Sequence, residues 1–256
     1  MTWQRGTLVV FLYFAAVAIV RPGMTRRARL TMLFASAGGL ALLASSSLLA
    51  SGGILNTWVL PPLLLLIAYW TSGVSFVSPM PRLEALLLEG DRRLRVDAIA
   101  ARLPRPIITM LEIAYAGVYP LVPIALLIGS RYGVGAQRFW TVVLLTDYIC
   151  FGALPWLQSR PPRSVGVAAP WTSRWRGLNI QLLDASSVQV NTFPSGHAAE
   201  AFAVALLLAG TPAPIPAVMF ICAAAISAAT VFGRYHYAAD ALAGWAVALA
   251  VFSLVA

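Results

Sequence analysis

Long apolar runs separated by short polar segments dominate this chain. One helical crossing of a bilayer core about 30 Å thick needs about 20 mostly apolar residues, and eight stretches approach that length. They lie near residues 3–20, 30–50, 54–77, 107–129, 138–157, 195–210, 213–232 and 239–256. The pattern predicts an all-α fold, a polytopic transmembrane helical bundle of about eight spans.

A different pattern occupies residues 81–103. Leucine and isoleucine recur there at helical spacing beside arginine and aspartate, which is typical of a helix that lies on the membrane interface. Pro104 and Pro106 are expected to end this helix before the next span begins.

Composition agrees with a bilayer as the solvent. Hydrophobic residues make up 60% of the chain and charged residues 11%, which fits no soluble class. The first apolar stretch runs into Arg21 and Pro22 rather than a small-residue cleavage site, so we expect a retained helix. Cys150 and Cys222 fall inside apolar stretches and imply no disulfide framework.

The formal net charge of +9 comes from arginine alone, because the chain has no lysine. With eight crossings, fifteen of the eighteen arginines fall in loops on one side of the membrane. Because positively charged loops stay in the cytosol, that side is predicted to be cytoplasmic. Membrane orientation and anionic headgroups explain the charge better than nucleic acid does.

The chain has two histidines, and each begins a predicted helix on the arginine-rich side. The first follows Pro194, Ser195 and Gly196 as His197. A serine at a helix start and a glycine that permits close approach favour an anion at the exposed amides. The alternative is an ordinary helix cap with a histidine at the interface.

The second histidine, His236, lies four residues before Asp240 and two after Arg234. This spacing places the histidine and the carboxylate on one helical face, where Asp240 could hold one ring nitrogen and make the other more reactive. The alternative is an aspartate cap that merely satisfies the histidine.

A proline-rich loop carries Arg160 and Arg163, whose guanidinium groups suit phosphate oxygens. A positive-inside loop is the alternative. Three acids fall inside predicted spans, where charge is costly: Glu112, Asp147 and Glu200. Glu200 could tune His197 or reach loop water, and none of the three is given a catalytic role.

Together these elements resemble the type-2 phosphatidic acid phosphatase superfamily, including its branch of inositol-phosphoceramide-synthase-like phosphotransferases. That pattern has an arginine-containing motif, a Pro-Ser-Gly-His motif, and a motif ending in histidine, three residues and aspartate. The resemblance covers about residues 155–245. It implies a six-helix phosphatase core over 54–256, preceded by a pair of transmembrane helices in 1–53.

Two positions depart from the pattern. Ala153 stands where a lysine is usual, and Thr230 where an arginine is usual, with Arg234 offered instead. The phosphotransferase branch has such reduced motifs, so hydrolysis and headgroup transfer both remain open.

The resemblance implies a role for each site residue. His236 would attack phosphorus to form a phosphohistidine, with Asp240 orienting it, and His197 would exchange protons with the leaving and entering oxygens. Arg160, Arg163, Arg234, Ser195 and Gly196 would bind the phosphate. The substrate would be a lipid or isoprenoid phosphate ester, with no metal and no other cofactor.

Other classes remain to be tested. His197 and His236 could be axial ligands of a haem, or the chain could be a transporter or scaffold without catalysis. The arginine bias places the site in the cytosol, whereas the resemblance suggests the outer face for many members of the superfamily.

Overall fold

The computed structural model describes residues 2–46 and 53–255. The regular elements in these ranges are helices, as the apolar pattern predicted. In chain order they are α1 (Trp3–Val20), α2 (Arg26–Ser46), the π-helix η1 (Leu55–Val59), α3 (Leu60–Val74), α4 (Pro81–Arg93), α5 (Val96–Ala100), α6 (Arg105–Ala116), α7 (Val118–Arg131), α8 (Ala136–Ala153), the 3₁₀-helix η2 (Pro162–Ser164), α9 (Arg174–Ser186), α10 (Gly196–Leu207), α11 (Ile215–Phe232) and α12 (Ala238–Val255).

Among the described residues, five helical segments are long and apolar enough to cross a membrane: α1, α2, η1 with α3, α11 and α12. The bent pair of α6 and α7 would make a sixth. The other two expected spans are also helices, but α10 has only 12 residues and α8 carries Arg138 and Asp147. The predicted helical membrane bundle is confirmed, and five or six segments within the described ranges qualify as candidate spans. Residues 47–50 of the second expected span and Ala256 of the last lie outside the described residues.

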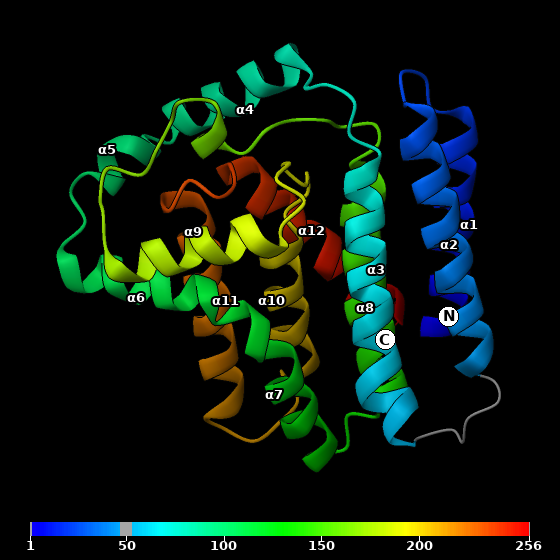
Figure 1. The fold of residues 1–256 in the computed structure, drawn as a ribbon. Coiled ribbons are helices and arrows are strands. Elements are labelled where there is room, and N and C mark those ends of the chain that lie inside the picture. Colours follow the sequence, from blue (N-terminus) through cyan, green and yellow to red (C-terminus); the bar gives the residue numbers. More distant parts are fainter. Residues whose placement is uncertain (1, 47–52, 256) are drawn as a thin grey trace.

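The expected span 107–129 is not one straight helix. The chain bends by 65° between α6 and α7. Pro120 has no N–H to donate to the carbonyl of Ala116, and its ring collides with that carbonyl in a continuous helix. Pro123 repeats the defect one turn later. The result is that α6 lies across the end of the bundle while α7 runs along it (Figure 1).

The amphipathic segment 81–103 forms α4 and α5, interrupted at Arg95, whose φ of 52° lies in the left-handed region. In Figure 1, α4, α5 and the turn between α1 and α2 lie at one end of the molecule. The connection between α7 and α8 lies at the opposite end. The loops that hold most of the arginines are therefore gathered at one end of the bundle.

The segment between the expected spans 138–157 and 195–210 contains a helix, α9, that the apolar pattern did not predict. Ser173 caps this helix by accepting a hydrogen bond from the N–H of Arg176 at 3.0 Å. Helix α9 packs alongside α6 at the arginine-rich end. We call these two helices the shelf; Tyr115 of α6 stacks on His197, in the first turn of α10.

The core is centred on α8, which packs against α1, α3, α10 and α12. Helix α10 packs in turn against α11 and α12. Its alanines are fully buried, and small side chains let neighbouring helices approach closely in a membrane protein. This packing places the N-terminus of α10 beside the N-terminus of α12. The division into a pair of transmembrane helices in 1–53 and a six-helix phosphatase core over 54–256 stays a prediction.

Candidate active site

The loop Gly233–Tyr237 joins α11 to α12 and carries His236. The N–H groups of Tyr235 and His236 both donate to the carbonyl of Thr230 at 2.9 Å, which closes the end of α11. Arg234 takes a left-handed φ of 61° to turn the chain. His236 Nδ1 then lies 3.3 Å from Asp240 Oδ2, which also accepts from the N–H of Tyr237 at 3.0 Å. The contact expected from the four-residue spacing is present, and Asp240 engages one of the two ring nitrogens.

His197 lies in the first turn of α10. Ser195 caps this helix through Oγ, which accepts from the N–H of Ala198 at 3.4 Å. The N–H of Ser195 itself donates to the carbonyl of Asp240 at 3.0 Å. Ser195 therefore builds the helix start, whereas the N–H groups of Gly196 and His197 follow it, at the positions where a helix leaves its first donors free.

The two histidines meet although they come from different helices. Their ring centroids lie 5.9 Å apart, close enough for one phosphoryl group to lie between the rings. Tyr115 stacks on His197 at 5.4 Å, and Tyr119 contacts the same ring edge-on at 6.0 Å. These tyrosines of α6 and α7 restrict the orientation of His197, so the bend between those helices contributes to the site.

Of the three arginines expected to bind phosphate, only Arg163 lines the cavity that holds both histidines. Its Nη1 contacts the carbonyl of Tyr235 at 3.4 Å, and its guanidinium carbon lies 5.9 Å from the centre of the Tyr235 ring. The backbone N–H of Arg163 donates to the carbonyl of Arg234 at 3.2 Å. This contact fastens the arginine loop to the loop of His236.

Arg160 and Arg234 are engaged elsewhere. Arg160 forms a two-pronged pair with Glu84 of α4, with distances of 3.0 and 2.9 Å. Arg234 is completely buried and pairs with Asp91 at 2.6 Å and with Asp97. Neither arginine is among the cavity-lining residues. Both attach the active-site loops to the amphipathic segment.

Hydrogen bonds, burial and nearby charges shift the pKa values of Glu84, Asp91 and Tyr235. Hydrogen bonds from Arg160 hold the pKa of Glu84 below its ordinary value. Burial raises the pKa of Asp91, although a hydrogen bond from the N–H of Ala238 and the charge of Arg234 oppose the rise. Burial, followed by the charge of Glu112, raises the pKa of the Tyr235 phenol, which stays a hydrogen-bond donor.

Glu112 connects the shelf to the site, a role that the sequence did not reveal. Its carboxylate is buried and accepts hydrogen bonds from four side chains: Trp171 at 2.9 Å, Arg176 at 3.2 Å, Asn179 at 2.7 Å and Tyr235 at 2.7 Å. Because Tyr235 precedes His236, this network braces the histidine loop. The signal available in the sequence was the cost of a carboxylate inside an apolar stretch.

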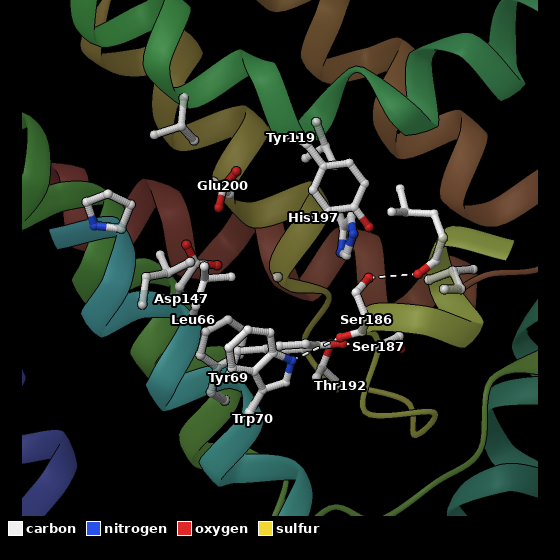
Figure 2. Close-up of a pocket in the computed structure, with 18 of the residues that line it drawn as sticks. Leu66, Tyr69, Trp70, Tyr119, Asp147, Ser186, Ser187, Thr192, His197 and Glu200 are labelled. Carbon is white, nitrogen blue, oxygen red and sulfur yellow. Dashed lines mark hydrogen bonds between the residues drawn. The ribbon is translucent and has the colours of Figure 1, made fainter. Parts of the chain in front are cut away.

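Both histidines line a cavity of about 660 Å³. Figure 2 shows His197, Tyr119 and Glu200 on one side of it, and Tyr69, Trp70 and Thr192 on the other. Away from the histidines the lining is mainly apolar and aromatic, and it comes from η1, α3, α7, α8 and α9: Trp58, Leu65, Leu66, Val118, Val122, Trp140, Phe151, Leu182 and Leu183. Leu66, Trp70 and Tyr119 are between 41% and 47% exposed. A cavity that is polar beside the histidines and apolar elsewhere suits an amphiphilic ligand.

The helical fold is that of a multi-pass membrane protein, and the paired histidines form its candidate active site. The pattern of the PAP2 superfamily matches residues 85–254, and the chain belongs to that superfamily. Membership indicates an enzyme of the phosphatase type that acts in a membrane. Comparison with curated proteins and with solved structures gave no match.

Proposed function

We propose that this protein is a metal-independent lipid phosphatase that hydrolyses a lipid or isoprenoid phosphate ester through a phosphohistidine. The observation that carries the proposal is the 5.9 Å separation of two histidine rings at the polar head of a largely apolar cavity. Arg163 lines the same head and supplies positive charge for the phosphoryl oxygens. The apolar remainder of the cavity accommodates the hydrocarbon chain.

In the first step, the His236 nitrogen that does not face Asp240 attacks phosphorus and forms an N–P bond. The bond from phosphorus to the leaving alcohol breaks, its electron pair goes to the alcohol oxygen, and protonated His197 donates a proton to that oxygen. In the second step, His197 removes a proton from water, the water oxygen attacks phosphorus, and the N–P bond breaks. Inorganic phosphate and free His236 result.

Charge stabilisation is assigned to Arg163 and to the N–H groups of Gly196 and His197. The phosphoryl oxygens gain charge in the transition state, where fixed donors in a water-poor site are most effective. The positive end of the α10 dipole acts in the same direction. Arg160, Arg234 and Ser195 contribute indirectly, because their own hydrogen bonds hold the loops and the helix start.

A panel of lipid phosphates assayed with a chelator tests this function. Wild-type protein is expected to release phosphate in the chelator, whereas His236→Ala abolishes release and still elutes as a folded protein. Labelled phosphate should be trapped on wild type as an acid-labile adduct and be missing in the variant. Metal-dependent release, or an undiminished His236→Ala, would contradict the proposal. A Soret band in the purified protein would favour the bis-histidine haem alternative.

From the distribution of arginines among the loops, we propose that the site lies at the cytoplasmic face of a cell membrane. The arginine-rich segments α4 and α5 lie at the end of the bundle where α10 begins and α11 leads into α12 (Figure 1), and these helix ends carry His197 and His236. Positive loops stay in the cytosol. A cysteine introduced at Ser173, in a background without Cys150 and Cys222, tests this. An impermeant reagent added to sealed, right-side-out cells should leave it unlabelled, and efficient labelling would reverse the orientation.

A further inference from the structure

The cavity contains two carboxyl groups that the proposed chemistry does not use, Asp147 of α8 and Glu200 of α10. Figure 2 shows them on neighbouring helices, each at the cavity wall. Asp147 is 1% exposed, and among the described residues its Oδ2 atom has no hydrogen-bond donor apart from the neighbouring carboxyl group of Glu200. A buried carboxyl oxygen with so few donors is costly, so this atom calls for a ligand that donates to it.

The acidic pair adjoins the site proposed for the phosphoryl group. Glu200 follows His197 by three residues, which places both on one face of α10. A side-chain carbon built on Gly196 would lie 3.3 Å from Asp147 Oδ1, so the carboxyl group reaches the helix start itself. The two carboxyl groups also form a hydrogen bond with each other, which requires a proton on one of them.

We propose that Asp147 and Glu200 form a subsite for hydrogen-bond donors on the alcohol esterified to the phosphoryl group. Apart from the proton that the pair shares, the carboxyl oxygens only accept hydrogen bonds. Their partial negative charge disfavours the phosphoryl oxygens, so the pair selects the opposite end of the headgroup. Hydroxyl groups and ammonium groups share the required chemistry.

This inference rests on the proposed function and extends it to headgroup transfer. An acceptor alcohol held by the pair would present its oxygen to the phosphohistidine beside His197. His197 takes the hydroxyl proton, the O–P bond forms, and the N–P bond to His236 breaks, so the headgroup is exchanged rather than released. The subsite thus decides which alcohol competes with water.

Three phosphodiester lipids with identical acyl chains test the subsite: phosphatidylinositol, phosphatidylethanolamine and phosphatidylmethanol. The first presents hydroxyl donors, the second an ammonium, and the third no donor. The measured quantity is the ratio of kcat/KM for a donor-bearing lipid to that for phosphatidylmethanol. Because both values come from the same preparation, the ratio does not depend on the fraction of folded protein.

Wild type is expected to prefer at least one donor-bearing lipid over phosphatidylmethanol. A preference for phosphatidylinositol identifies hydroxyl groups as the donors, and a preference for phosphatidylethanolamine identifies the ammonium group. Asp147→Asn should lower the ratio at least tenfold, and Glu200→Gln should lower it in the same direction. Asp184→Asn is the matched control, because Asp184 is exposed on α9 and is not among the residues lining the cavity; its ratio should equal that of wild type.

Failure of the subsite and failure of the proposed function are distinguishable. A wild type that hydrolyses phosphatidic acid but cleaves all three diesters equally, or none of them, overturns the subsite and leaves the phosphatase intact. Unchanged ratios in both Asp147→Asn and Glu200→Gln also overturn it. A wild type inactive on phosphatidic acid and on every diester overturns the proposed function, and the subsite with it.

Discussion

The N–H of Ser195 donates to the carbonyl of Asp240 at 3.0 Å, and this one bond joins the starts of α10 and α12. His197 follows the donor in the chain and His236 precedes the acceptor, so the bond sets how far apart the two rings lie. Gly244 of α12 lies directly against the same joint, because a side-chain carbon there would stand 2.7 Å from the carbonyl oxygen of Ser195.

Gly244→Val should therefore separate the two helix starts. Overpacking at a tight contact costs about 1–3 kcal/mol, and the displaced His197 would no longer share a phosphorus atom with His236. We expect phosphatase activity to fall by more than tenfold, measured as phosphate release per folded protein. Gly210→Ala is the control, since nothing lies within 4 Å of the added carbon. Full activity in Gly244→Val would contradict the importance of this joint.

Tyr235→Phe tests the brace between Glu112 and the histidine loop. The variant removes a 2.7 Å hydrogen bond to a buried carboxylate and keeps the aromatic contact with Tyr115. A hydrogen bond to a charged group contributes about 1.5–3 kcal/mol, and we expect kcat to fall about tenfold with little change in KM. Tyr132→Phe, at an exposed position, should behave as wild type. A change confined to KM would argue against positioning of His236.

Arg163→Ala and Arg234→Ala should fail in different ways. Loss of one charge-stabilising donor lowers kcat by about a hundredfold to a thousandfold, and we expect this of Arg163→Ala with the thermal midpoint nearly unchanged. Arg234→Ala leaves the buried Asp91 without its partner, which costs about 3–5 kcal/mol. Thermal unfolding in detergent separates the two. A stable but inactive Arg234→Ala would instead place that arginine on the phosphate.

The pair of Glu84 and Arg160 predicts a pH-dependent difference in stability. Because the folded state lowers the pKa of Glu84, the pair stabilises the protein above the unfolded value of about 4.3, and this stabilisation is lost as pH falls through the lower folded value. The thermal midpoint of Glu84→Gln should lie below that of wild type at neutral pH, and the two should converge in acid. Glu89→Gln, which removes an exposed pair, should show a smaller gap. A gap that persists in acid would contradict this account.

Local sequence sufficed for most of the helices and for the histidine–aspartate pair. Long apolar runs indicate directly that a helix is surrounded by lipid. A four-residue spacing brings His236 and Asp240 together in any helix start. Local sequence did not suffice for the break at Gly117. Prolines inside an apolar run weaken a helix, but packing against neighbouring helices determines whether and where it bends. Helix α9 escaped detection because its sequence is mixed in polarity and its apolar face packs on α6.

By itself, then, the sequence determined the membrane class, the PAP2-like motifs and the residues from which a site could be assembled. Only the tertiary structure decided that Arg163 faces the cavity while Arg160 and Arg234 bind Glu84, Asp91 and Asp97. The physical reason is the distance along the chain over which each interaction acts. Periodicity and helix-start chemistry act over a few residues, whereas the partner of a charged side chain depends on which distant segment the packed helices bring beside it.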